Sequence, residues 1–331
     1  MILTVTPNPS LDKTVELSAP LAVGQVQRAA GQHAEPGGKG VNIARALAAA
    51  GEDSLALLPG DPGDPVLTAL EELAVRHEAL PIGTPLRTNI TITDPAGTTT
   101  KVNELGPALP QERVEAFLET VIRRAGSASW AALAGSLPPG MPETFYADVI
   151  AGLRNAGGPQ PPPIAVDASG PALAHAAASG PDLIKPNAEE LLELHAALCG
   201  AAASPAVSPA ELEGERGLAA ELVRSVQKHG VRAALVTLGA HGAVLVPEPS
   251  SDAPVLAASG PPLVVRSTVG AGDASLAGYV LAAHRGAAAE ERLRRAAAQG
   301  RAAASLPGST MPRPQDLRIL DIVVEELPPT K

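Results

Sequence analysis

The chain has 331 residues, 45% of them hydrophobic, and a net charge of −10 from 25 lysines and arginines against 35 aspartates and glutamates. This size suits one large α/β domain or two small ones, while the acidic balance and the 2% aromatic content argue against a nucleic-acid-binding surface. The single cysteine, Cys199, excludes an internal disulfide and a cysteine-based metal site, and the lack of a membrane-length apolar run or a basic N-terminal segment leads us to expect a cytoplasmic protein without membrane partners.

Hydrophobic periodicity predicts strands that alternate with helices along most of the chain. The predicted strands cover residues 1–6, 14–17, 25–30, 54–58, 87–93, 98–104, 130–134, 164–167, 183–184, 233–238, 243–246 and 262–265. The predicted helices cover residues 41–50, 65–75, 110–124, 142–154, 218–226, 274–284 and 287–305, with another starting near residue 187. This alternation implies a mostly parallel sheet with right-handed crossovers.

Three segments fall outside this alternation. The strands at 87–93 and 98–104 predict a hairpin, which we expect in a small sheet apart from the main one. Residues 157–163 predict a Pro-rich loop, and the Ala/Ser/Pro-rich residues 199–213 predict a surface insertion.

Polar residues follow the first strand, at the edge where α/β sheets bind their ligands. They are Asn8, Ser10 and Asp12, which are also common turn formers. Farther on, Gly37-Gly38-Lys39-Gly40 leads into a helix that carries Asn42. Such a turn lets the backbone approach a ligand, with Lys39 suited to a phosphate and Asn42 to sugar hydroxyls. A plain loop-to-helix junction with a solvated lysine is the alternative.

A second glycine-rich turn, Gly270-Ala271-Gly272-Asp273, precedes the helix predicted at 274–284. The free N–H groups and the dipole of a helix N-terminus favour an anion, and the glycines permit close approach. Asp273 either caps the helix or accepts a proton from an attacking hydroxyl. Neither a Walker loop nor a dinucleotide fingerprint is present, since Ser275 stands where the fingerprint has its third glycine.

Three other residues have both a structural and a functional interpretation. Asn187 and Glu190 are spaced as an N-capping pair, a role that is compatible with binding a metal at the same time. Arg87, at the start of a predicted strand, is either a phosphate clamp or an ordinary exposed arginine.

Taken together, seven segments resemble the phosphofructokinase B branch of the ribokinase-like sugar kinases. They are TVTPNPSLD from Thr4, PGGKGVNIARAL from Pro36, RTN from Arg87, GSLPPG from Gly135, KPNAEEL from Lys185, VTLGAHGAV from Val236 and STVGAGDASLAG from Ser267. The resemblance implies one kinase domain over residues 1–331, with a central, mostly parallel sheet flanked by helices and a small β-sheet lid built from segments near 12–34 and 86–106. It also implies a homodimer that forms through this lid.

The implied activity is phosphoryl transfer from Mg²⁺–ATP to a phosphorylated ketohexose. D-fructose 1-phosphate, phosphorylated at the C6 hydroxyl, is the expected substrate, because Lys39 and Arg87 supply cations that an unphosphorylated sugar does not need. Tagatose 6-phosphate and fructose 6-phosphate are alternatives within the branch. A non-catalytic sugar-phosphate or nucleotide sensor is an alternative from another class, although a sensor needs no base.

The resemblance assigns roles residue by residue. It makes Asp273 the catalytic base and Gly270, Ala271 and Gly272 the anion hole. Asn187 and Glu190 would organise Mg²⁺ through water. The sugar hydroxyls would contact Asp12, Gly38 and Asn42, and the sugar phosphate would contact Lys39 and Arg87, with Arg28 and Ser136 as further candidates. The nucleotide would be bound by Lys185, Asn187, Thr237, Gly239, Gly242 and Thr268.

Overall fold

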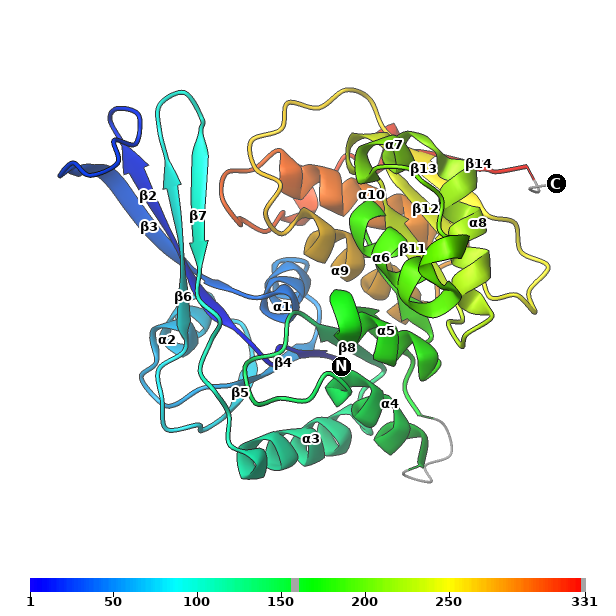
Figure 1. Ribbon diagram of the computed structural model, residues 1–331, viewed down its shortest axis with the longest axis horizontal. Helices are drawn as coiled ribbons and strands as arrows, with labels where there is room; N and C mark the ends of the chain where they lie inside the picture. Colours follow the sequence, from blue (N-terminus) through cyan, green and yellow to red (C-terminus); the bar gives the residue numbers. More distant parts are fainter. Residues whose placement is uncertain (156–160, 329–331) are drawn as a thin grey trace.

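The computed structural model describes residues 1–155 and 161–328, and it contains a large and a small sheet (Figure 1). Across these residues the large sheet has ten strands. In spatial order they are β14 (Val323–Glu326), β13 (Leu256–Ser259), β12 (Ala243–Val246), β11 (Ala234–Thr237), β10 (Leu183–Ile184), β9 (Ile164–Asp167), β8 (Trp130–Ala134), β1 (Ile2–Val5), β4 (Ser54–Pro59) and β5 (His77–Leu80). Neighbours are parallel from β5 to β11 and antiparallel from β11 to β14, which confirms the expected mostly parallel α/β sheet.

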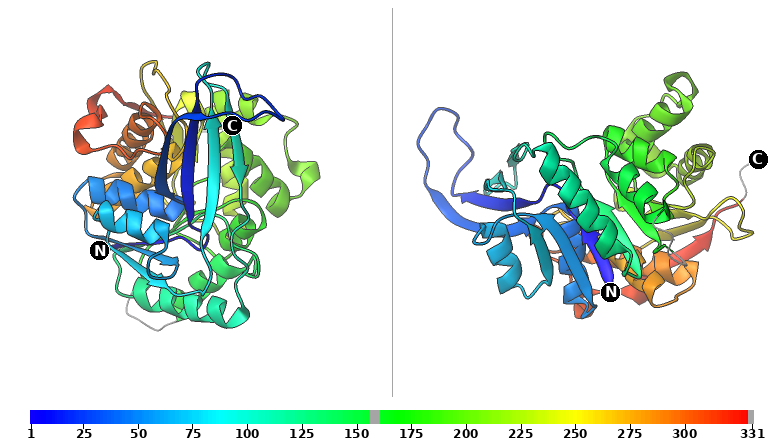
Figure 2. Two further views of the ribbon diagram at one scale, coloured as in Figure 1. Left: turned by 90° about the vertical axis from the view of Figure 1, so that its left-hand side faces the viewer. Right: turned by 90° about the horizontal axis from the view of Figure 1, so that it is seen from below.

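Helices cover both faces of the large sheet. One face carries α1 (Lys39–Ala49), α9 (Ala271–His284) and α10 (Ala289–Ala304). α2 (Pro65–Glu72), the crossover from β4 to β5, lies on this same face beside α1 (Figure 2). The other face carries α3 (Gln111–Ala125), α4 (Phe145–Asn155), α5 (Gly170–Ala178), α6 (Ala188–Cys199), α7 (Pro209–Gly214) and α8 (Arg216–Gln227). Short 3₁₀ helices lie at Ala201–Ala203, Gly239–His241, Pro314–Asp316 and Ile319–Asp321. Within the described residues, no helix combines the length and the apolar character that a membrane span requires.

Two apolar cores form because successive side chains of a strand point to opposite faces of its sheet. In β1, Ile2 joins the core beneath α1 and α9, while Leu3 and Val5 join the core beneath α3 and α4. All three side chains are fully buried, as expected for a continuous apolar run in a parallel sheet covered on both faces.

The small sheet projects from one side of the helical body (Figures 1 and 2). Its strands, in order, are β3 (Ala29–Gly37), β2 (Ser10–Leu17), β6 (Arg87–Thr93) and β7 (Thr99–Asn103). The predicted hairpin is therefore confirmed, as β6 and β7. The register sets Ser10 opposite Arg87 and Asp12 opposite Asn89, so polar residues from distant segments gather at the base of this sheet.

The strand predicted at residues 262–265 is wrong. The strand in this region is β13, which ends at Ser259 and pairs with β12 and β14. Pro261 and Pro262 follow it, and a proline has no N–H group to donate to a neighbouring strand. The apolar residues that suggested a strand form an exposed loop, in which the Val264 side chain is 83% exposed.

Two further expectations need correction. No strand covers residues 25–28, because Gln27 hydrogen-bonds the backbone of Pro20 and Ala22 and closes a loop before β3 begins at Ala29. The segment 199–213 is not simply a surface insertion. It contains α7, which has a capping box formed by Ser208 and Glu211 and buries Leu212 completely in the core. The loop expected at residues 157–163 lies largely outside the described residues.

Parallel strands bring their carboxyl ends to one edge of a sheet, where α/β proteins bind ligands. The residues that follow β1, β8, β9, β10 and β11 therefore share this edge. They include Asn8, Ser136, Asp167 at the end of β9, Lys185 and Gly239.

Leu212→Ala tests whether α7 belongs to the core. Truncation of this fully buried side chain should lower the free energy of unfolding by about 2–5 kcal/mol, measured by urea denaturation. Leu320→Ala is the control, since Leu320 is 97% exposed and its loss should cost less than about 0.5 kcal/mol. Equal stabilities for the two variants would show that α7 is not packed as described.

Candidate active site

The N-terminus of α9 forms the floor of the site. Gly270 is the N-cap residue and has φ 76°, a conformation that favours glycine. A Cβ atom there would also lie 2.6 Å from the Met311 side chain. The first N–H groups of a helix have no partner within it, so this turn offers donors to an anion.

Asp273 lies in the first turn of α9 and is only 8% exposed. Its Oδ2 accepts a hydrogen bond from Asn42 Nδ2 at 2.8 Å. Burial, reinforced by the negative charge of Asp167, raises the pKa of Asp273 to about 6, although Asn42, Lys185 and Lys39 act in the opposite direction. The group is therefore ionised at neutral pH, with a pKa close enough to neutrality for it to act as a general base.

A buried ion cluster lies beside Asp273. The fully buried carboxylate of Asp167 is 2.7 Å from Lys39 Nζ and 2.9 Å from Lys185 Nζ. Burial alone would raise the pKa of Asp167, but the two ammonium groups outweigh that effect and hold it below its usual value. Lys39 Nζ also lies 3.1 Å from Glu190 Oε1, so two carboxylates converge on one cation.

Glu190 and Asn187 form the predicted capping box of α6. Asn187 Oδ1 accepts from the Glu190 N–H at 2.8 Å, and Glu190 Oε2 accepts from the Asn187 N–H at 2.9 Å. The cap uses one oxygen of Glu190 and leaves the other facing Lys39 and, beyond it, Asp167.

The free oxygen of Glu190 fits a magnesium ion that is held partly by the protein. Mg²⁺ is usually bound by one or two carboxylates together with water and substrate phosphates, and Glu190, which lines the larger cavity, supplies such a carboxylate. No group of three His, Cys, Asp or Glu side chains arranged to hold a metal occurs in the described residues, so a cage made of protein ligands alone is not the expected arrangement.

Two cavities meet at this cluster. A cavity of about 930 Å³ lies over the N-terminus of α9 and the ends of β10 and β11, and one of about 250 Å³ lies at the base of the small sheet. Lys39, Gly270 and Asp273 line both. A ligand in one cavity would therefore meet a ligand in the other at Asp273.

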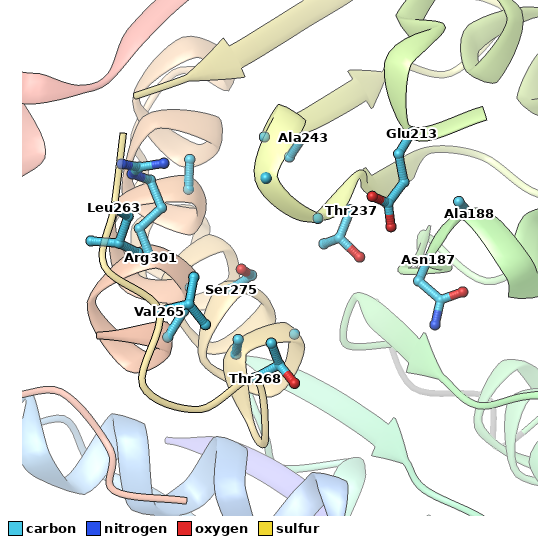
Figure 3. Close-up of a pocket in the computed structure, with 18 of the residues that line it drawn as sticks. Asn187, Ala188, Glu213, Thr237, Ala243, Leu263, Val265, Thr268, Ser275 and Arg301 are labelled. Atoms are coloured by element: carbon cyan, nitrogen blue, oxygen red, sulfur yellow. The ribbon is translucent and has the colours of Figure 1, made fainter. Parts of the chain in front are cut away.

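The larger cavity brings together all the residues expected to bind a nucleotide. They are Lys185, Asn187, Thr237, Gly239, Gly242 and Thr268, joined by Ala271, Gly272 and Glu190. Figure 3 shows Thr237 and Glu213 on one side of the open space and Thr268 and Val265 on the other.

The smaller cavity contains most of the residues expected to bind the sugar. They are Asp12, Gly38, Lys39, Asn42, Arg87 and Ser136. Arg28 is the exception, since it is exposed in the loop between β2 and β3 and lines neither cavity.

Several polar atoms in the smaller cavity are buried without a hydrogen-bond partner among the described residues. They are Arg87 Nε, Asn89 Oδ1 and Asn8 Oδ1. The other guanidinium nitrogens of Arg87 donate to the carbonyls of Glu104 and Asn8, each at 3.0 Å, and burial lowers the pKa of this arginine. Because buried polar groups are nearly always paired, these free atoms indicate a polar ligand.

Sequence reasoning did not select three residues of the site. Asp167 ends a buried strand, and a carboxylate at the carboxyl end of a strand lies at the ligand-binding edge, so its position could have identified it. Asn89 lies two residues after Arg87 on the same face of β6, where strand periodicity could have identified it. Glu213 comes from α7, and no local pattern pointed to it.

Comparisons with known proteins agree with this geometry. Residues 6–316 match the family described as pfkB family carbohydrate kinase. The chain is 35% identical to the 1-phosphofructokinase of Rhodobacter capsulatus, over 99% of this chain and 98% of that one. It is 32% identical to the 1-phosphofructokinase of Haloferax volcanii, over 98% of each chain. The structure of phosphofructokinase-2 from Escherichia coli in complex with substrates and products has a TM-score of 0.80 and 28% identity, over 95% of this chain and 96% of that one.

Asp273→Asn should make the protein more stable at pH 8. A carboxyl group whose pKa rises on folding binds its proton more tightly in the folded state, so stability is lost as the pH rises from about 4 through about 6. Asparagine removes this cost, and we expect the free energy of unfolding to increase by about 1–3 kcal/mol at pH 8, with the gain disappearing near pH 4. Denaturant unfolding at several pH values measures it.

Asp252→Asn is the matched control, because Asp252 is exposed. It should leave the free energy of unfolding nearly unchanged at every pH. A destabilised Asp273→Asn variant at pH 8 would contradict the electrostatic account of this site.

Proposed function

Since the chain belongs to the pfkB family of carbohydrate kinases, we propose that it transfers the γ-phosphoryl group of ATP to the C6 hydroxyl of D-fructose 1-phosphate. The products are fructose 1,6-bisphosphate and ADP, which is the reaction of a 1-phosphofructokinase (EC 2.7.1.56). The main support is that the smaller and the larger cavity meet at Asp273, in the first turn of α9.

In the proposed reaction Asp273 accepts the proton of the C6 hydroxyl. The oxygen then bonds to the γ-phosphorus while the bond from that phosphorus to the β–γ bridging oxygen breaks, and ADP leaves. The backbone N–H groups of Gly270, Ala271 and Gly272 stabilise the charge on the transferring group. Loss of one such donor in a comparable site costs about 2.7–4 kcal/mol of transition-state stabilisation.

We assign the 1-phosphate of the sugar to Arg87, whose Nε is free and buried in the smaller cavity. Asp12, Gly38, Asn42 and Ser136 are then left for the hydroxyl groups. Lys39 was expected at the same phosphate. Its contacts with Asp167 and Glu190, and its position at the junction of the cavities, suit it better to the transferring phosphoryl group.

The nucleotide would occupy the larger cavity, with its phosphates toward Thr268 and the N-terminus of α9 and its remainder toward Thr237, Gly239 and Gly242. Lys185 would neutralise phosphate charge near Gly272, since a Cβ atom at residue 272 would lie 3.2 Å from Lys185 Nζ. Mg²⁺, held by Glu190 and, through water, by Asn187, would neutralise the phosphate oxygens.

We also propose a cytoplasmic homodimer that forms through the small sheet, which would serve as a lid. The large apolar side chains of Val23, Val26, Val102 and Leu105 are 54–99% exposed on this sheet and its loops. Such residues, together with unpaired edges at β3 and β7, favour association with a second copy.

A coupled ADP-release assay with Mg²⁺–ATP tests the activity. Of fructose 1-phosphate, fructose 6-phosphate, tagatose 6-phosphate and free fructose, the first should have the highest kcat/KM, and chelation of Mg²⁺ should abolish turnover. Asp273→Asn should reduce kcat by about 10²–10⁴-fold with little change in sugar binding, because only proton transfer is lost. Preference for a 6-phosphate would reassign the substrate, and turnover of none would favour a sensor.

Arg87→Ala tests the phosphate site. Loss of a charge-assisted contact should raise the KM for fructose 1-phosphate roughly 10- to 100-fold, with a smaller effect on the KM for ATP. Arg76→Ala is the control, because Arg76 is 64% exposed and pairs with Asp53 away from both cavities. An unchanged sugar KM in Arg87→Ala would refute the assignment.

A further inference from the structure

Arg45 is a buried arginine to which the proposed mechanism gives no role. It lies on α1, is only 7% exposed and lines neither cavity. Its Nη1 donates to Pro36 O at 3.0 Å, to Asn42 Oδ1 at 3.1 Å and to Ser309 Oγ at 3.3 Å, and its Nη2 lies 3.2 Å from Glu35 Oε1. A charge buried this deeply is costly unless an opposite charge and hydrogen bonds compensate for its lost hydration.

The contact between Arg45 and Asn42 determines which way the Asn42 amide points. The two residues are three apart on α1 and therefore share a face. A guanidinium group only donates hydrogen bonds, so Asn42 must present its oxygen to Arg45 and its NH₂ group to Asp273. In the flipped orientation the amide oxygen would face the Asp273 carboxylate, and the NH₂ group would face the guanidinium.

We propose that Arg45 is a positioning residue for phosphoryl transfer, and that it acts by locking the Asn42 amide with its NH₂ group toward Asp273. One oxygen of the carboxylate is thereby held, and the other remains available for the proton of the acceptor hydroxyl. This inference rests on the proposed role of Asp273 as the base.

Arg45 is itself held from two other parts of the fold. Glu35 lies on β3 of the small sheet, and its Oε2 accepts from the hydroxyl of Ser309 at 2.6 Å and from the Ser309 N–H at 3.2 Å. A chain of hydrogen bonds therefore runs from Glu35 through Arg45 and Asn42 to Asp273. It connects β3, α1 and α9, and α1 lies between the small sheet and α9 (Figure 1).

The orientation of Asn42 also affects the proton affinity of Asp273. The other charged groups that face Asp273 are Asp167, which favours its protonated form, and Lys185 and Lys39, which favour its ionised form. The Asn42 hydrogen bond adds to the effect of the two lysines. An amide that is free to rotate would donate less often, so the carboxylate would bind its proton more tightly.

A double-mutant cycle on kcat tests the proposal, with Arg45→Lys, Asn42→Ala and the double variant assayed on the best sugar substrate. Lysine keeps the charge opposite Glu35 but lacks the planar fork that reaches Asn42. Arg45→Lys should lower kcat on the order of 10-fold and shift the acid limb of the kcat–pH profile upward by about one unit, with the KM for ATP unchanged.

If Arg45 acts through Asn42, the double variant should be no slower than Asn42→Ala alone. The proposal would be overturned if the kcat losses of Arg45→Lys and Asn42→Ala multiplied in the double variant. It would also be overturned if Arg45→Lys lowered kcat without shifting the pH profile, and Arg45 would then be a structural residue. Arg76→Lys, at an exposed site, should change neither kcat nor the kcat–pH profile. If Arg45→Lys does not fold, Glu35→Gln replaces it in the same cycle, and it should likewise lower kcat and shift the acid limb upward.

A readout without turnover separates this proposal from the proposed function. The difference between the wild type and Asp273→Asn in the pH dependence of unfolding reports the proton affinity of Asp273 in the folded state, and the same difference measured in the Arg45→Lys background should have its midpoint at a higher pH. An inactive wild type or a fully active Asp273→Asn variant would refute the proposed function. An unmoved midpoint would refute the role of Arg45.

Discussion

The buried carboxylate of Asp167 is the group around which the site is built. A fully buried charge is tolerated only when opposite charges compensate it, and Lys39 and Lys185 do so, one at each carboxylate oxygen. This requirement holds the start of α1 against the ends of β9 and β10. The glycine-rich turn before α1 is therefore fixed where the two cavities meet, which places Asn42 within hydrogen-bond distance of Asp273.

The same ion cluster determines what Asp273 can do. Burial and Asp167 make its negative charge less favourable, whereas Lys39, Lys185 and the Asn42 amide make it more favourable. The balance leaves a pKa of about 6, and a general base works best when its pKa is close to the pH at which it operates. The residues that anchor the fold at this edge are therefore also those that adjust the proton affinity of the base.

Local patterns predicted the buried strands and the longer helices well, because their apolar periodicity reflects burial on one or both faces. They failed where partners distant in sequence decide the outcome. Residues 262–265 have the composition of a strand, but the place beside β12 is taken by Leu256–Ser259. Leu212 packs in the core although its segment is rich in Ala, Ser and Pro. β5 and β14 are short edge strands that the periodicity did not indicate.

The sequence by itself determined the α/β class, the two glycine-rich helix starts and most of the residues that line the cavities, because these depend on neighbours within a few positions. Only the tertiary structure decided that Asp167 pairs with both lysines, that Asn89 joins Arg87 in the smaller cavity, and that Arg45 holds Asn42. Each of these contacts depends on burial or on strand register. Both are set by how distant segments pack. Local spacing places Asn89 on the face of Arg87 and Arg45 on the face of Asn42, but it does not determine that these faces are buried or which distant residues they meet.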